Sequence, residues 1–356
     1  MSRGEGILLR NLTVIRRLVQ TLVVVFLLFG AGVVGPYAAD KVSGAWPALT
    51  CAFDSQSGDY CALVPLQHQS THRIGEAVVG GRDLATGALT MGLTLGTFLI
   101  LFVLLNKAFC SWTCPLGYFQ ELLALLGQKV GLRQPEGLPA GAVHRTRPVK
   151  WIVLGLLVFG IPLLAGLGVS AGGFSNHAPY CEVCPSRFLT TLATADPSQI
   201  RVSLASPGAA FWTGSGLFLF GMMITLGMTL RQPFCRVCPM LALQAAFRRL
   251  GLLRLVKRPS SRCDKCGLCA RACPMDIHEI QSSTRAGDAT MADCTLCGRC
   301  VEMCPERDVL QLRYAGIKVF GADPVYFKAR NRAQRRWEAA SLVGWWRRRR
   351  AGEGRA

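Results

Sequence analysis

The sequence predicts an α-helical integral membrane protein with four transmembrane helices, followed by a small cysteine-rich α+β domain. Of the 356 residues, 51% are hydrophobic and only 17% are charged, whereas a soluble chain carries about 25% charged residues. The apolar content also excludes intrinsic disorder. The 16 cysteines gather in short motifs of a long chain, which excludes a small secreted disulfide scaffold.

Four uncharged runs predict the transmembrane helices. They cover 18–39, 84–106, 151–181 and 202–230. About 20 apolar residues cross the hydrocarbon core as a helix, so each run is long enough. We expect the spans at 18–39, 84–106, 151–172 and 209–230. Buried helices of a soluble protein would need polar faces, which the first run lacks. A cleaved signal peptide is the alternative for that run, but its apolar stretch exceeds a signal core of about 7–15 residues.

The distribution of basic residues predicts the orientation in the membrane. Four arginines precede the first span, and six basic residues follow the second span before residue 151. Residues 37–86 and 171–209 contain only three and two basic residues. The positive-inside rule therefore places both termini on the cytoplasmic side of a bacterial inner membrane. Much of the net charge of +19 is then explained without a nucleic-acid partner.

The C-terminal tail is also basic. After residue 327 it contains ten lysines and arginines, together with Trp337, Trp345 and Trp346. Basic residues beside tryptophans are typical of segments that bind an anionic membrane surface. A nucleic-acid-binding tail and a frayed basic end are the alternatives.

A doubled cysteine motif carries the strongest chemical signal. Cys-x2-Cys-x2-Cys-x3-Cys-Pro begins at Cys263 and again at Cys294, and this is the spacing of bacterial two-cluster ferredoxins. Three cysteines of each motif bind one [4Fe–4S] cluster, while the fourth reaches the other cluster. The predicted ligands are Cys263, Cys266, Cys269 and Cys304 for the first cluster, and Cys294, Cys297, Cys300 and Cys273 for the second. Zinc is the alternative metal, but two full copies ending in Cys-Pro favour clusters.

These signals divide the chain into three parts. Residues 1–257 are expected to form the transmembrane domain, and 258–316 a C-terminal α+β two-cluster bacterial ferredoxin-like domain. Residues 317–356 form the basic tail. Thiolate clusters belong in a reducing compartment, which agrees with the cytoplasmic placement of this end.

Three shorter Cys-Pro motifs lie in the membrane part of the chain. They contain Cys110 and Cys114, Cys181 and Cys184, and Cys235 and Cys238. Four spans place the first and third motifs at the cytoplasmic face, where Cys110, Cys114, Cys235 and Cys238 are candidate ligands of a third cluster or two structural thiol turns. The second motif is then expected outside with two loop cysteines. The outside set, Cys51, Cys61, Cys181 and Cys184, forms disulfides or holds a fourth cluster.

Together these motifs resemble a known family. The chain is similar to the membrane-bound polyferredoxins in three features. These are Phe-Cys-x3-Cys-Pro-Leu-Gly at 109–117, a second Cys-Pro motif after the last span, and a C-terminal two-cluster ferredoxin. These include NapH-type quinol dehydrogenases and their NosR-type and MauN-type relatives. The resemblance covers about residues 87–310. It implies electron transfer between the quinone pool and a periplasmic or membrane-bound redox partner. The x2 spacing of Cys235 and Cys238 and the extra outside cysteines depart from the pattern.

Two classes of function follow. The first is a subunit of a quinol dehydrogenase or related oxidoreductase of an anaerobic respiratory complex, which relays single electrons through its clusters. The second is an accessory redox sensor, or a maturation factor that supplies electrons to another metalloenzyme. His68 and His72 lie four residues apart, as haem or quinone ligands on one helix face do, although most such pairs in a polar loop are solvated. His144 and His177 carry no further signal.

Overall fold

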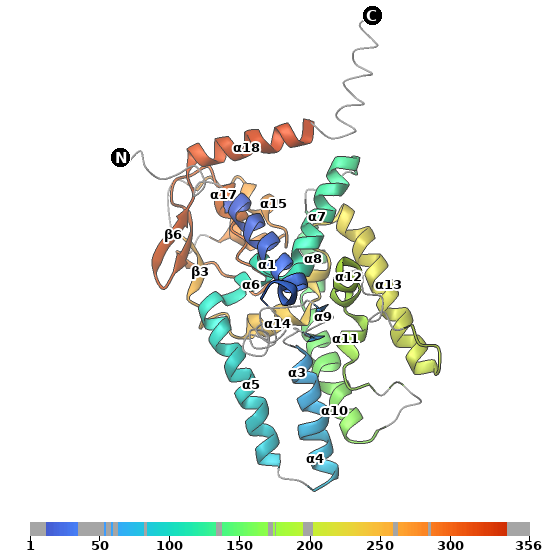
Figure 1. Ribbon diagram of the computed structural model, residues 1–356. Coiled ribbons are helices and arrows are strands. Elements are labelled where there is room, and N and C mark those ends of the chain that lie inside the picture. Colours follow the sequence, from blue (N-terminus) through green and yellow to red (C-terminus); the bar gives the residue numbers. More distant parts are fainter. Residues whose placement is uncertain are drawn as a thin grey trace, which may run out of the picture.

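The computed structural model describes residues 12–34, 53–54, 58–59, 63–81, 84–132, 137–169, 174, 176–194, 202–258, 263–283 and 286–339. Cys51, Cys61, Trp345 and Trp346 lie outside the described residues, as does the side chain of Trp337. Figure 1 shows an elongated molecule, with the sheet-containing C-terminal part at one end and apolar helices extending from it.

Three helical runs are long and apolar enough to cross a membrane, among the residues described. They are Leu84–Val130, Ala140–Gly166 and Pro207–Thr229. The first contains α5 (Leu84–Leu105), η4 (Asn106–Ala108), α6 (Phe109–Trp112) and α7 (Pro115–Val130). The second contains α8 (Ala140–Thr146), α9 (Val149–Val153), η5 (Leu154–Gly160) and α10 (Ile161–Gly166), and the third is α13. Three of the four expected spans fall on these runs.

The remaining expected span, 18–39, overlaps α1 (Leu12–Val34), which is not among the three runs. This helix begins six residues earlier than expected, and its first turns lie against the C-terminal domain. The Leu12 backbone N–H donates to the Tyr326 hydroxyl at 2.8 Å, and the Arg16 side chain is fully buried. The presence of four transmembrane helices therefore stays a prediction.

A helix that the sequence analysis did not expect lies between α5 and α10. It consists of α3 (Leu63–His68), the π-helical η3 (Gln69–Gly75) and α4 (Glu76–Val79), in a segment predicted to be a polar loop. Gln69 donates from Nε2 to Thr94 Oγ1 of α5 at 2.6 Å. A Cβ atom on Gly75 would lie 2.7 Å from the Gly166 backbone, so glycine permits the close approach of this helix to α10.

The connection from α10 to α13 does not stay at the far end of the molecule. It forms α11 (Pro179–Val183) and α12 (Pro185–Thr194). In Figure 1, both helices lie beside α13, closer to the C-terminal part than α10 does. The chain after α10 therefore turns back toward the centre of the molecule.

The C-terminal domain is built on a four-stranded antiparallel sheet with the order β4-β3-β5-β6. The strands are β3 (Leu253–Lys257), β4 (Gly287–Asp288), β5 (Leu310–Tyr314) and β6 (Ile317–Gly321). The helices around the sheet are α15 (Leu268–Ala272), α16 (Glu279–Ser282), α17 (Arg299–Glu302) and α18 (Pro324–Ala339), and α14 (Pro239–Ala246) precedes it. A separate small pair, β1 (Phe53–Asp54) and β2 (Gly58–Asp59), lies in the N-terminal half.

The predicted domain boundaries at 258 and 316 are too narrow. β3 pairs with β5 through Leu255 and Leu312, and β6 pairs with β5, so strands on both sides of the predicted segment belong to its sheet. The two leucines are at most 4% exposed and form the core beneath the cysteine loops.

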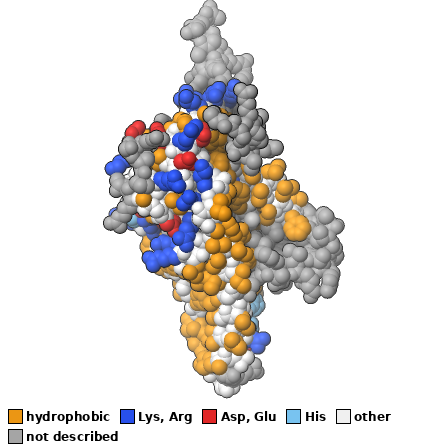
Figure 2. All heavy atoms as spheres, turned by 90° about the vertical axis from the view of Figure 1, so that its left-hand side faces the viewer, with side chains coloured by type: hydrophobic (Ala, Val, Ile, Leu, Met, Phe, Trp, Pro, Cys, Tyr) orange, Lys and Arg blue, Asp and Glu red, His pale blue; other side chains and the backbone are white. Residues whose placement is uncertain are grey.

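Figure 2 shows lysines and arginines on the upper part of the molecule, where the C-terminal domain lies, and mostly hydrophobic side chains below it.

Candidate iron–sulfur centres

The second predicted cluster set lines one cavity in the C-terminal domain. Cys273, Cys294, Cys297 and Cys300 line this cavity, together with apolar side chains of the sheet and helices. Gly298 adopts a positive φ of 75°, which lets the loop turn between Cys297 and Cys300. Four thiols around one apolar cavity fit a [4Fe–4S] cluster, which is bound by cysteine thiolates.

The first predicted set is gathered in the same way. Burial, together with the neighbouring thiolates of Cys269, Cys266 and Cys263, raises the pKa of Cys304 to about 11. Burial also raises the pKa of Cys273, with smaller contributions from Cys297 and Cys294. The last cysteine of each motif therefore lies with the first three of the other motif. The structure brings together both sets that the spacing predicts.

The three shorter Cys-Pro motifs share one local conformation. Cys114 (φ −68°, ψ 118°), Cys184 (φ −74°, ψ 120°) and Cys238 (φ −67°, ψ 124°) are all extended. Each precedes a proline that begins a helix: α7, α12 or α14. Proline disfavours the helical conformation in the residue before it and suits the first helical position itself. The repeated sequence therefore produces a repeated turn with a cysteine at its end.

The four cysteines predicted to hold a third cluster also lie together. Burial, together with the thiolate of Cys114, raises the pKa of Cys238 to about 11. Burial likewise raises the pKa of Cys235, again with contributions from Cys114 and Cys238. Cys110 donates from Sγ to Gln244 Oε1 at 3.1 Å. Four thiols from two sequence-distant turns provide the donor set of an iron–sulfur site.

The predicted separation of Cys181 and Cys184 from Cys238 is wrong. The Tyr180 hydroxyl lies 3.7 Å from Cys238 Sγ and 3.8 Å from Cys184 Sγ. Gln67 donates from Nε2 to Cys181 Sγ at 3.3 Å. The sequence analysis assumed that the chain after α10 stays outside, whereas α11 and α12 return to the centre. The predicted link to Cys51 and Cys61 lies outside the described residues.

The loop between Cys110 and Cys114 contacts the loop between Cys294 and Cys297. The Ser111 hydroxyl donates to the Thr295 carbonyl oxygen at 2.6 Å, and Trp112 Nε1 donates to the Leu296 carbonyl oxygen at 3.3 Å. In each hydrogen bond, the donor residue lies between Cys110 and Cys114, and the acceptor residue lies between Cys294 and Cys297. The third thiol set and the second ferredoxin set are therefore adjacent.

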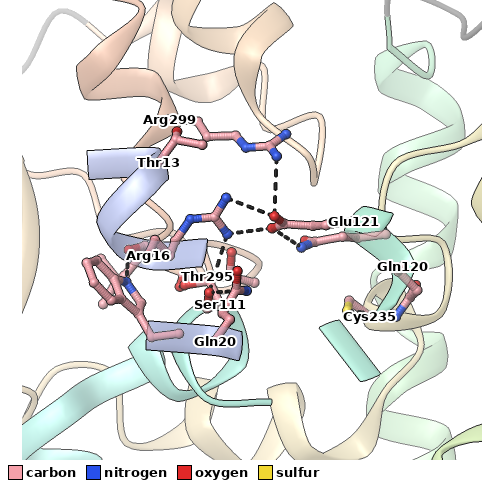
Figure 3. A network of polar contacts seen from close by, with 12 residues as sticks. Thr13, Arg16, Gln20, Ser111, Gln120, Glu121, Cys235, Thr295 and Arg299 are labelled. Carbon is pink, nitrogen blue, oxygen red and sulfur yellow. Dashed lines mark hydrogen bonds and ion pairs between the residues drawn. The ribbon is translucent and has the colours of Figure 1, made fainter. Parts of the chain in front are cut away.

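A buried ion pair stabilises this contact, as Figure 3 shows. Arg16 binds both carboxylate oxygens of Glu121 at 2.5 and 2.9 Å, and both side chains are at most 3% exposed. Arg299 of the ferredoxin domain contacts the same carboxylate at 3.4 Å. Glu121 is adjacent in sequence to Gln120, which donates from Nε2 to Cys235 Sγ at 3.4 Å. One network therefore connects α1, α7 and the C-terminal domain.

Two further ion pairs join the cysteine loops. Arg236, directly after Cys235, binds Asp276 at 2.6 Å and donates to the Pro274 and Met275 carbonyl oxygens. Lys150 pairs with Asp293, directly before Cys294. The sequence analysis did not identify these roles, because it counted Lys150 only as a topology signal and did not consider Arg236. The positions of Arg236 and Asp293 next to cysteines were the available clue.

Comparisons with known families agree with the cysteine pattern. The family described as a 4Fe-4S binding domain matches residues 88–133 and 212–259, each a helix followed by a Cys-Pro motif. The family described as a 4Fe-4S dicluster domain matches residues 262–307. Neither match includes Cys181 or Cys184. No solved structure matches the chain.

Several individual proteins are similar to the chain. It is 30% identical over 222 residues to YccM of Escherichia coli K12, covering 61% of this chain and 54% of YccM. It is 26% identical over 244 residues to the ferredoxin-type protein NapH of Haemophilus influenzae, covering 66% of this chain and 73% of NapH. It is 28% identical over 200 residues to the methylamine utilization ferredoxin-type protein MauN of Methylobacillus flagellatus, covering 56% and 58%. The chain spans about half the length of YccM.

These comparisons agree with the resemblance expected from the motifs. Ferredoxin-type 4Fe-4S domains match the chain, three helices among the described residues are apolar enough to cross a membrane, and the similar proteins include NapH and MauN. The chain therefore contains ferredoxin-type 4Fe-4S domains and is similar to the polyferredoxins of the NapH and MauN type.

Proposed function

We propose that the chain relays electrons between the quinone pool and a periplasmic or membrane-bound redox partner, as part of an anaerobic respiratory complex. In this proposal the chain crosses the inner membrane several times, with both termini in the cytoplasm. Its ligands are the two ferredoxin sets and a third set, Cys110, Cys114, Cys235 and Cys238. The clusters, when bound, supply one-electron transfer.

One observation carries this proposal. Ser111 and Trp112, between two ligands of the third set, donate hydrogen bonds to carbonyl oxygens between Cys294 and Cys297. The ion pair between Arg16 of α1 and Glu121 of α7 stabilises the same region. Because the two thiol sets belong to different domains, this contact provides a fixed connection from the membrane helices to the ferredoxin domain.

The protein residues determine the environment of each centre. Gln120 donates to Cys235 Sγ, and hydrogen bonds to cluster sulfurs help to set the reduction potential. Cys273 and Cys294 of the second ferredoxin site are each 7% exposed, and solvent exposure also affects the potential.

The test uses the full-length protein, purified anaerobically into lipid nanodiscs. Iron analysis should give about twelve iron atoms per chain for three clusters. A quinone should reoxidise the dithionite-reduced protein, or a quinol should reduce the oxidised protein, as followed by electron paramagnetic resonance. Electron transfer in either direction supports the proposal. The proposal fails if dithionite reduces the clusters but neither a quinone nor a quinol exchanges electrons with them. That result would favour the accessory role.

A further inference from the structure

Three histidines form a stack on the side of the molecule formed by α3, η3 and the segment before α11. The ring centroids of His68 and His72 are 5.7 Å apart, and those of His72 and His177 are 5.2 Å apart. The planes of these pairs differ by 27° and 13°. His72 Nδ1 also contacts Glu76 Oε1 at 2.6 Å. Neither the cysteine sets nor the ferredoxin domain uses these residues.

The stack lies beside a membrane-crossing helix. Gln69, next to His68, binds Thr94 in the middle of α5, and the Arg73 backbone approaches Gly87, near the start of α5. The histidine segment therefore follows the first half of that helix. Ionisable side chains at such a depth are costly and usually serve a function.

The histidines are open to the surroundings of the protein. All three are exposed, and the side chains of His72 and Glu76 are 44% and 46% exposed. A ligand dissolved in the lipid could therefore reach the imidazoles directly, without a path through the protein.

A short connection joins the stack to the cysteine centre. Gln67, directly before His68, is fully buried. Its Nε2 donates to Cys181 Sγ, and its Oε1 accepts from the Tyr180 backbone N–H at 3.1 Å. Tyr180 in turn contacts Cys238 Sγ, which is a proposed ligand of the third cluster. The histidines and the thiols are thus connected through residues in direct contact.

The arrangement fits an organic ring better than a metal ion. The imidazoles stack nearly face to face, whereas a shared metal ion would lie in the plane of each ring that binds it. A planar ring can pack against such a stack. Hydroxyl groups on the ring can donate to imidazole nitrogens and to the Glu76 carboxylate.

The geometry points to a binding site for the quinol head group at His68, His72, His177 and Glu76. This inference rests on the proposed quinone link and names its site. Oxidation of one quinol breaks two O–H bonds. The two protons pass to imidazole nitrogens, with Glu76 as the partner of His72, and the two electrons leave singly to the iron–sulfur acceptors of the proposed relay. Quinone reduction reverses each transfer.

A binding titration tests the site. Full-length protein in nanodiscs of phosphatidylethanolamine and phosphatidylglycerol is titrated with a fluorescent hydroxyquinoline N-oxide, which resembles a quinol head group. We expect His72→Gln and Glu76→Gln each to weaken binding by about tenfold, the effect of losing one hydrogen bond to the head group. His144→Gln is the matched control, because His144 also lies near a glutamate, Glu279, at 3.7 Å, but in α8. It should bind like the unmodified protein.

Iron content and the dithionite-reduced spectrum show whether each variant is folded and loaded. The inference is overturned if a loaded His68→Gln/His72→Gln/His177→Gln variant binds the probe within about twofold of the unmodified protein. If quinol still reduces that variant at the normal rate, the proposed function stands and only the site is wrong. If the unmodified protein neither binds the probe nor exchanges electrons with quinones, both proposals fail.

Discussion

The Ser111 hydroxyl donates a 2.6 Å hydrogen bond to the Thr295 carbonyl oxygen, and each residue directly follows a cysteine, Cys110 or Cys294. The bond connects a turn at the end of a membrane helix with a ferredoxin loop. Both partners are at most 2% exposed, so the hydrogen bond is shielded from water.

Ser111→Ala should therefore destabilise the contact between the two loops. Loss of a buried donor leaves its acceptor unsatisfied and costs about 1–3 kcal/mol. The measurement is urea unfolding of the anaerobic protein, followed by the iron–sulfur absorbance. Thr225→Ala is the control, because its exposed hydroxyl bonds only to the Gly221 carbonyl oxygen in its own helix. Equal unfolding midpoints for both variants would contradict the prediction.

Glu121→Gln should have a larger effect. The substitution leaves the fully buried guanidinium of Arg16 without its charged partner, and breaking a buried pair costs about 3–5 kcal/mol. Asp308→Asn removes the more exposed pair with Lys318 and should cost at most about 1 kcal/mol. Thermal loss of the cluster absorbance compares the two. A smaller effect for Glu121→Gln than for Asp308→Asn would show that the buried network does not stabilise the fold.

The local structure of the cysteine motifs depends on a few residues, so it was within reach of the sequence. Proline favours an extended residue before it and suits the first position of a helix, which is the conformation found at Cys114 and Cys238. The assignment to ferredoxin-type domains is confirmed by the family matches.

The long-range arrangement was harder to predict. Hydropathy indicates which runs can cross a membrane, but it does not show that the chain after α10 returns to place Tyr180 against Cys238. The helix with His68 and His72 was missed because its glutamine, histidine and arginine residues are typical of a loop, whereas contacts with α5 and α10 stabilise it. The pairing of Arg16 with Glu121 spans 105 residues, and no local pattern encodes it.

Single cysteine variants test the proposed ligand sets. Cys235→Ser should lower the iron content of the full-length protein from about twelve to about eight atoms per chain, because one cluster of three loses a ligand. Cys181→Ser should leave about twelve, since Cys181 contacts Gln67 and is not in the proposed set. Anaerobic iron and sulfide analysis gives both values. A loss of iron in the Cys181 variant as well would show that the third site uses the second Cys-Pro motif.

Tyr180→Phe tests whether the hydroxyl tunes the third centre. This hydroxyl lies between Cys184 Sγ and Cys238 Sγ, and it donates to Cys238 when that sulfur is a thiolate ligand. A donor stabilises the more negative, reduced state, so its loss should lower the reduction potential. The expected decrease is roughly 20–40 mV, because one weak hydrogen bond contributes about 0.5–1 kcal/mol. Phenylalanine keeps the ring, and the two ferredoxin clusters serve as internal controls in a redox titration followed by electron paramagnetic resonance. An unchanged potential at the third centre, or an equal shift at all three, would show that the hydroxyl does not act on Cys238.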